Sequence, residues 1–134
     1  MRFTIRTKGH YHFIDITDKV REAVENSGMK EGMVLVFVRG STAALTIMEF
    51  EKGLIEDIKE TLEKIAPESG DYKHHLKGSD RNGAAHIKSA LIGTDLAVPI
   101  ESGGLSLGTW QKITLIDFDE KEREREIVIK IIKE

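Results

Sequence analysis

The order of apolar and polar residues along the chain predicts a protein built mainly of strands. Apolar and polar residues alternate over 3–7 and less cleanly over 11–16, and 33–38 form a continuous apolar run typical of a central strand. The Gly103-Gly104 pair and the charged run 119–125 are predicted as turns. The predicted strands cover residues 3–7, 11–16, 33–38, 43–47, 95–100, 105–107, 110–118 and 127–132.

Three segments have the spacing of amphipathic helices. In the clearest, 52–66, apolar side chains recur at intervals of three and four from Leu54 to Ile65, and Pro67 follows as a stop. Two shorter helices are predicted. One follows the cap residues 15–18, has Val20, Ala23 and Val24 on one face and is ended by Gly28; the other covers 84–91 and is ended by Gly93. The segment 68–81 between the second and third helices is polar and irregular. Ordered loops of this length often carry function.

These elements predict one α+β domain over residues 1–134, with a mainly antiparallel, sandwich-like core and two to three helices. Strands outnumber helices and mostly follow one another, and the chain shows no repeat and no linker. The last predicted strand, 127–132, has apolar side chains on both faces. A strand of this kind at the end of the sheet would invite aggregation, so it favours a subunit interface.

Composition and charge exclude several classes of function. The 134 residues include 20 basic and 23 acidic side chains, a net charge of −3, whereas nucleic-acid binders usually carry a basic excess. Cysteine is absent, which excludes disulfides and thiolate chemistry. No apolar run approaches the roughly 20 residues of a membrane helix, so we expect a cytoplasmic protein. The scarcity of Asn and Gln beside abundant Glu and Lys is typical of a thermophile.

Histidines are the strongest candidates for chemistry. His74 and His75 lie in the polar segment, and His86 lies on the short helix that follows. Imidazole titrates near neutrality, so histidines that converge in a cleft suit proton transfer or metal ligation. The alternative is that His74 and His75 are solvated and His86 packs. His10 and His12 would face the same side of a strand, as a metal chelate or as two surface histidines.

Two glycine-rich turns could bind an anion. Backbone N–H groups in the segments around Gly103 and Gly108 could hold a phosphate, but neither segment matches a phosphate loop or a dinucleotide fingerprint, and taken alone the segments are better explained as ordinary hairpin turns. No Gly-x-Ser-x-Gly elbow is present. Glu49, a lone acid after the strand 43–47, is either a base or cation ligand, or an exposed acid at a strand end.

Several segments together resemble one known family, the YjbQ-like proteins. The most specific is the string Leu105-Ser106-Leu107-Gly108-Thr109-Trp110-Gln111, with His86 about two dozen residues before it, and the resemblance covers nearly the whole chain. The other matching segments are residues 41–47 with Glu49, Tyr72-Lys73-His74, 82–88, Ala90-Leu91-Ile92-Gly93 and Val98-Pro99-Ile100.

The resemblance implies a compact α+β homotrimer with a histidine pocket near a subunit junction. Members are described as secondary thiamine-phosphate synthases, which join a hydroxymethylpyrimidine pyrophosphate to a thiazole phosphate. By position, His86, His74 and Glu49 match catalytic residues, His74 and His86 match ligands of a divalent metal (zinc or magnesium), and no organic cofactor is implied. The positions matching substrate-binding residues are Ser41, Thr42, Lys88, Gly103, Gly104, Gly108, Thr109, Trp110 and Gln111.

The chain departs from the family pattern at three places. Many members have histidine at the positions of Gly40 and Ala84, and asparagine at that of Met48. A three-histidine metal site therefore requires His75 as a substitute. Histidine ligands favour zinc over magnesium, which prefers oxygen. Two rival functions follow: metal-assisted hydrolysis of a phosphorylated small molecule, and a trimer that binds an anionic metabolite without catalysis.

Overall fold

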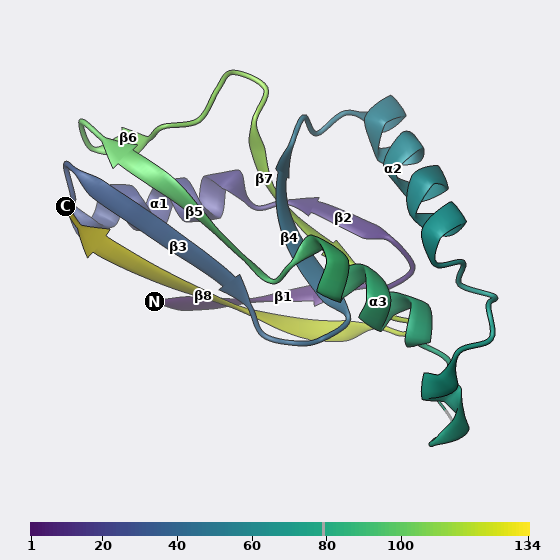
Figure 1. Ribbon diagram of the computed structural model, residues 1–134. Helices are drawn as coiled ribbons and strands as arrows, with labels where there is room; N and C mark the ends of the chain where they lie inside the picture. Colours follow the sequence, from purple (N-terminus) through teal and green to yellow (C-terminus); the bar gives the residue numbers. More distant parts are fainter. Residues whose placement is uncertain (79) are drawn as a thin grey trace.

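A computed structural model describes residues 1–78 and 80–134 of the chain (Figure 1). The described residues form a single α+β domain with three α-helices, one 3-10 helix (η1) and two antiparallel sheets, which confirms the predicted fold class. The elements are β1 (Arg2–Thr7), β2 (His12–Asp15), α1 (Thr17–Ser27), β3 (Gly32–Val38), β4 (Ala43–Met48), α2 (Lys52–Ile65), η1 (Lys73–Leu76), α3 (Gly83–Ile92), β5 (Asp95–Glu101), β6 (Gly104–Leu105), β7 (Lys112–Asp117) and β8 (Arg123–Lys133).

The two sheets pack face to face and α1 packs into the same core. One sheet has the order β1-β8-β3-β5-β6 and the other β2-β7-β4. Period-2 alternation directs Val34 and Val36 of β3 and Ile127 and Ile129 of β8 into the space between the sheets. Burial of these side chains supplies the main stabilisation of the fold.

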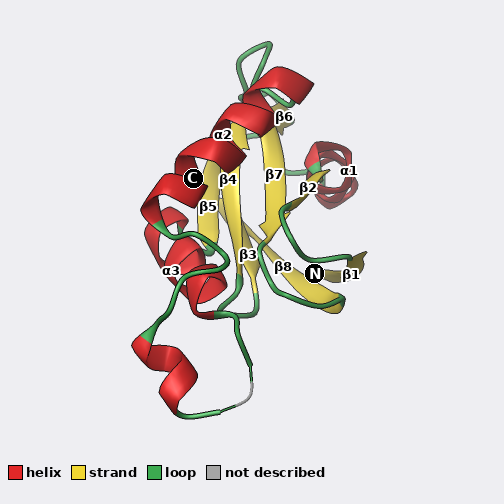
Figure 2. Cartoon of the chain, turned by 90° about the vertical axis from the view of Figure 1, so that its right-hand side faces the viewer, coloured by secondary structure: helices red, strands yellow, loops and turns green. Residues whose placement is uncertain are grey.

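The helices α2 and α3 cover the other face of the three-stranded sheet, as the side view in Figure 2 shows. A second apolar cluster joins Leu62 of α2 and Ala85 of α3 to Ile116 and Phe118. The Leu45 N–H donates to the Gly93 carbonyl, and the Ser89 hydroxyl donates to the Ala43 carbonyl. These bonds fix the last turn of α3 against the start of β4.

The charged run 119–125, predicted as a turn, is a turn only in its first half. β8 begins at Arg123 and pairs with β1 on one edge and β3 on the other, so the last strand is an interior strand of its sheet. It extends into the charged run because Arg125 points inward and meets buried carboxylates there. The strand predicted over 110–118 is shorter, and Trp110 lies in a turn before β7.

Part of the outer face of the five-stranded sheet is apolar, although Lys130 lies opposite Leu35 on the same face. Met33, Phe37 and Ile132 expose 41%, 38% and 45% of their surface, and the half-buried Leu35 and Val128 lie between them. The surface therefore concentrates apolar side chains on one flat face. None of the helices that the structure describes has the length and apolar character needed to cross a membrane.

Candidate functional site

Two of the predicted histidines meet at the start of α3. The ring of His86, in α3, lies 4.5 Å from the ring of His74, in η1, measured between centroids, at an interplanar angle of 58°. Burial, together with the neighbouring His74, lowers the pKa of His86 below the ordinary value of 6.5. His86 is therefore neutral at physiological pH, the form that accepts a proton or binds a metal.

His75 holds η1 against α3. Its Nε2 accepts a hydrogen bond from the Gly83 N–H at 3.0 Å, and its ring packs edge-on against Tyr72. A side chain at position 83 would collide with this arrangement, since a Cβ there would lie 2.9 Å from the His75 Nε2. His75 therefore fixes the segment that carries His74, and its Nε2 is engaged within the protein.

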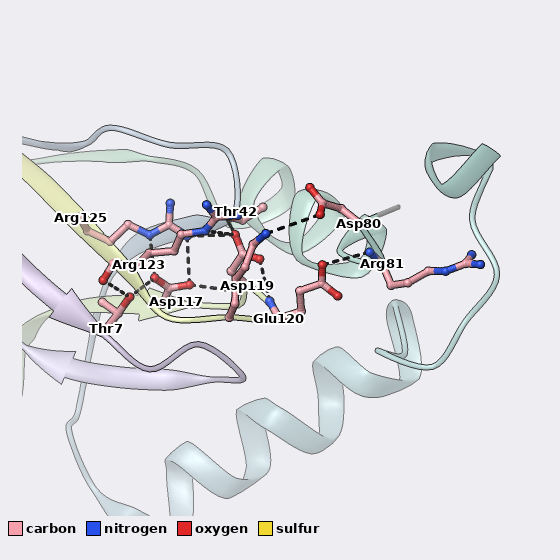
Figure 3. A network of polar contacts seen from close by, with 10 residues as sticks. Thr7, Thr42, Asp80, Arg81, Asp117, Asp119, Glu120, Arg123 and Arg125 are labelled. Carbon is pink, nitrogen blue, oxygen red and sulfur yellow. Dashed lines mark hydrogen bonds and ion pairs between the residues drawn. The ribbon is translucent and has the colours of Figure 1, made fainter. Parts of the chain in front are cut away.

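A buried polar network joins Thr7, Thr42, Asp117, Asp119 and Arg125 (Figure 3). The Arg125 guanidinium donates to both Asp117 oxygens, at 2.6 and 3.0 Å, and to the Thr42 hydroxyl at 2.6 Å. The Thr42 hydroxyl donates in turn to Asp119 at 2.8 Å. Thr7 closes the other end of the network by donating to Asp117. The predicted substrate-binding Thr42 is thus buried and held from two sides.

This network positions the main chain next to His86. Burial alone would raise the pKa of Asp119, but hydrogen bonds from Thr42 and Arg123 lower it below its ordinary value. Thr42 follows Ser41, whose main chain lies near the His86 ring and opposes the fall in the His86 pKa. The carboxylates thus orient the imidazole indirectly, through the bend that contains Ser41 and Thr42.

Thr42→Val is expected to make the fold more sensitive to acid. An aspartate whose pKa is lowered by folding stabilises the protein above its unfolded pKa, and this stabilisation is lost as the pH falls through the folded value. Without the Thr42 hydroxyl the folded pKa of Asp119 rises, so the midpoint of acid unfolding, followed by circular dichroism, should move to higher pH. The control is Thr46→Val, which should leave the midpoint in place.

Lys88 lies inside the protein, between α2, α3 and the sheet. It exposes 1% of its surface, and its Nζ forms an ion pair with Glu63 at 2.8 Å. The ammonium also lies 4.4 Å from the Tyr11 ring centroid, and the Tyr11 hydroxyl donates to the same carboxylate. The positive charge of Lys88 is therefore compensated within the fold, and it faces away from any external phosphate.

Glu49 and the segment around Trp110 lie at the other end of the three-stranded sheet. β4 begins beside the histidine pair and Glu49 follows its last residue, roughly 20 Å away at about 3.3 Å per residue. The pairing of Met48 with Lys112 places Gln111 at this same end. Trp110 exposes 70% of its surface. The exposed turn is closed by bonds from the Gly108 N–H to the Gln111 side chain and from the Gln111 N–H to the Gly108 carbonyl.

Gly103 and Gly104 belong to the β5–β6 hairpin. Ser102 and Gly103 have φ values of +49° and +82°, as a tight hairpin turn requires. The Gly103 N–H donates to the Lys30 carbonyl. This donor is therefore used within the protein. Thr109, like its neighbours, is exposed in the separate turn before β7. Of the predicted site residues, a single chain thus brings together Ser41, Thr42, His74 and His86. The other predicted catalytic and substrate-binding residues lie away from the histidine pair.

The histidine pair provides two imidazole ligands, one short of the three protein ligands of a typical catalytic zinc site. Within residues 1–78 and 80–134, no three histidine, aspartate or glutamate side chains are grouped so that they could hold a metal ion. A single chain therefore does not provide a complete metal site, and His75 does not complete it.

The sequence analysis missed Asp117, Asp119 and Arg125. A signal for these residues is present in the sequence, because Asp117 and Asp119, and likewise Arg123 and Arg125, are two positions apart. In an extended chain this spacing places both members of a pair on the same side. Charged residues are usually exposed, so the sequence alone predicts an exposed turn over 119–125.

The fold and the histidine pair define a small α+β protein with a candidate acid–base site at the start of a helix. A family model described as UPF0047 protein YjbQ-like matches residues 1–134. A UPF0047 protein of Archaeoglobus fulgidus is 43% identical over 132 residues, 98% of this chain and 100% of that protein. The chain therefore belongs to the YjbQ/UPF0047 family, as its motifs predicted.

Solved structures agree with this assignment. A YbjQ-like protein of unknown function from Sulfolobus solfataricus superposes with a TM-score of 0.90 at 37% identity, covering 100% of this chain and 97% of that one. An uncharacterized conserved protein of the same family from Clostridium acetobutylicum gives a TM-score of 0.89 at 40% identity, covering 98% and 99%.

Proposed function

We propose that this protein is a thiamine-phosphate synthase-like transferase that uses the His74–His86 pair. The observation that carries the proposal is the half-buried His86, whose ring lies 4.5 Å from a second imidazole and whose pKa is lowered by burial. In the reaction, the thiazole nitrogen forms a bond to the methylene carbon of the pyrimidine, and the carbon–oxygen bond to pyrophosphate breaks. Pyrophosphate leaves with the electron pair of that bond.

His86 acts as the general base in this mechanism. It accepts a proton from the amino group of the pyrimidine as pyrophosphate departs, which neutralises the positive charge developing on the ring, and returns the proton once the carbon–nitrogen bond has formed. His74 and the Ser41 hydroxyl donate hydrogen bonds to the leaving phosphate oxygens. Thr42 positions Ser41, and Lys88 stays paired with Glu63.

The proposed site is completed in a homotrimer. Glu49 and the Trp110 turn lie too far from His86 in one chain, so a neighbouring subunit would supply them. The apolar outer face around Met33, Phe37 and Ile132 supports assembly, because water contact there is unfavourable. Sedimentation equilibrium should give three chains per particle. A monomer at micromolar concentration would contradict this assembly.

The assay is the conversion of the two phosphorylated substrates to thiamine phosphate, with zinc, magnesium or no added metal. We expect thiamine phosphate to form at a rate proportional to the enzyme concentration. One equivalent of pyrophosphate should be released with it. Failure to form product with any metal, by a folded protein that still binds phosphorylated compounds, would contradict the synthase and favour a non-catalytic binding protein. In that case ligands would raise the melting temperature without turnover.

Metal-assisted hydrolysis of a phosphorylated small molecule is the second candidate. The donor set favours it, because two imidazoles suit zinc better than magnesium, and a neighbouring subunit could supply the third ligand. Metal content of the purified protein, measured for wild type and His86→Ala, separates the two functions. Stoichiometric zinc lost in the variant, with phosphate released from phosphomonoesters, would support the hydrolase.

A further inference from the structure

The apolar face of α2 is only partly covered within the fold. Its apolar side chains recur at helical spacing from Leu54 to Ile65, yet Leu62 alone is buried. Leu54 and Ile58 line a groove of about 360 Å³ between α2, the three-stranded sheet and the end of α3. An amphipathic helix normally buries such a stripe against a neighbouring element, so this groove is a surface on which another apolar group can pack.

The groove combines aliphatic walls with one negative charge. Ile92 and Ile116 complete the apolar lining, and Asp57 is the one charged side chain among the described residues that line it. Asp57 belongs to α2 and is exposed. A group complementary to this groove therefore joins an aliphatic side chain to a nearby positive charge.

The 3-10 helix η1 presents a group of this kind. Leu76 is 84% exposed, more than any other large apolar side chain in the described part of the chain. Lys73 stands three residues earlier, and positions three apart share one face of a 3-10 helix. η1 projects from the rest of the domain at the bottom of Figure 2. A leucine and a lysine are thus displayed together on a protruding turn.

The clamp between His75 and Gly83 fixes η1 in this projecting position. The Gly83 N–H donates to the His75 Nε2, and the His75 ring packs edge-on against Tyr72. Because the turn is already ordered, little conformational entropy is lost when Leu76 is bound. Leu76 does not line the groove of its own chain, so the two surfaces meet only between chains.

We propose that Leu76 of one chain inserts into the α2 groove of a second copy, where Lys73 of the inserting chain pairs with Asp57. Leu76 is the anchor of the contact, and the exposed ion pair mainly fixes its orientation. The contact joins two different surfaces of the same chain. Heterologous contacts of this type build closed rings, and a cyclic trimer requires one.

The contact also bears on the site proposed above. Thr46 lines the groove, and Glu49 follows it by three residues at the end of β4. Insertion of Leu76 therefore brings η1, with its His74, to the side of a neighbouring chain that carries Glu49. The inference rests on the proposed trimer, but not on the chemistry assigned to it.

Disulfide cross-linking tests the contact directly, because the chain has no cysteine of its own. Leu76→Cys combined with Thr61→Cys, at a position that lines the groove, should give covalent dimers and trimers on a denaturing gel after mild oxidation. The two single variants, co-expressed, should give a covalent dimer and nothing larger, since each chain then carries one thiol. Leu76→Cys combined with Asn26→Cys, at an exposed position of α1, is the matched control and should not cross-link.

A second measurement tests the leucine without a thiol. Leu76→Asp should raise the dissociation constant of the assembly, measured by sedimentation equilibrium, by at least about tenfold, because it places a carboxylate in an apolar groove beside Asp57. The exposed position of Leu76 leaves the fold of the single chain unchanged, which circular dichroism checks. Leu76→Met keeps an apolar side chain of similar size and should assemble as wild type does.

Two results would overturn the contact. One is the absence of covalent dimers from the double-cysteine protein, including the case in which its groove instead takes up an apolar dye. The other is unchanged assembly of the folded Leu76→Asp protein. A cross-linked trimer without turnover would contradict the transferase but support this contact, and turnover by an assembly that does not cross-link would do the reverse.

Discussion

Arg125→Met is expected to lower the free energy of unfolding by about 3–5 kcal/mol, the usual cost of removing one partner from a buried ion pair. The methionine fills most of the space, but Asp117 loses both guanidinium bonds and stays buried with a charge. Thr42 loses a donor as well. Urea unfolding followed by circular dichroism measures the change.

The matched control for Arg125→Met is Arg6→Met. Arg6 is also on a strand of the five-stranded sheet and also pairs with a carboxylate, Glu124, but its side chain is 73% exposed. Exposed pairs contribute about 0–1 kcal/mol, so the control should unfold nearly as wild type does. Equal, small effects of both substitutions would show that the Asp117–Arg125 pair does not stabilise the fold.

His86→Ala is expected to reduce turnover of the proposed reaction by roughly 10²-fold or more, the scale of losing a general acid–base group. The wild-type rate should fall as the pH drops through the pKa of His86, because only neutral imidazole accepts a proton. Burial and His74 lower that pKa, so activity should persist to a lower pH than an ordinary histidine would allow. Initial rates across pH, measured on both proteins, check the two expectations.

His12→Ala is the control for this substitution. His12 lies on β2, and its Nδ1 accepts the Lys8 N–H at 3.0 Å, so it is a histidine engaged outside the His74–His86 pair. Its loss should leave turnover within a factor of about two of wild type. Full activity of a folded His86→Ala protein with unchanged assembly would remove His86 from the mechanism.

Local patterns in the sequence were sufficient to predict most of the fold. Helical spacing from Leu54 to Ile65 predicted α2, and the apolar run that ends at Val38 predicted β3. Both patterns are visible in the sequence because each element buries apolar side chains against a neighbouring layer of the fold. The start of β8 was not predictable in this way. Arg123 and Arg125 read as solvent-exposed charges, whereas long-range pairing with β1 and the ion pairs to Asp119 and Asp117 make them part of a strand.

The candidate site was predictable in residue type but not in geometry. His74 and His86 were identified from imidazole chemistry and from a family motif, whereas their contact depends on the clamp between His75 and Gly83, which no local pattern shows. The same limit applies to Lys88. Its place in the motif suggested a phosphate ligand, but the fold surrounds it with Glu63 and Tyr11.

The interior place of β8 determines when the protein can fold during synthesis. β8 lies between β1 and β3, so the edges of these two strands that face it stay unpaired until the ribosome has released the residues of β8. The contact between Arg2 and Glu126, for example, joins residues 124 positions apart in the sequence. Such long-range pairing is slow, because chain entropy is lost before many contacts form. Until β8 has emerged, the nascent chain therefore exposes unpaired edges of β1 and β3, and the large sheet cannot be completed.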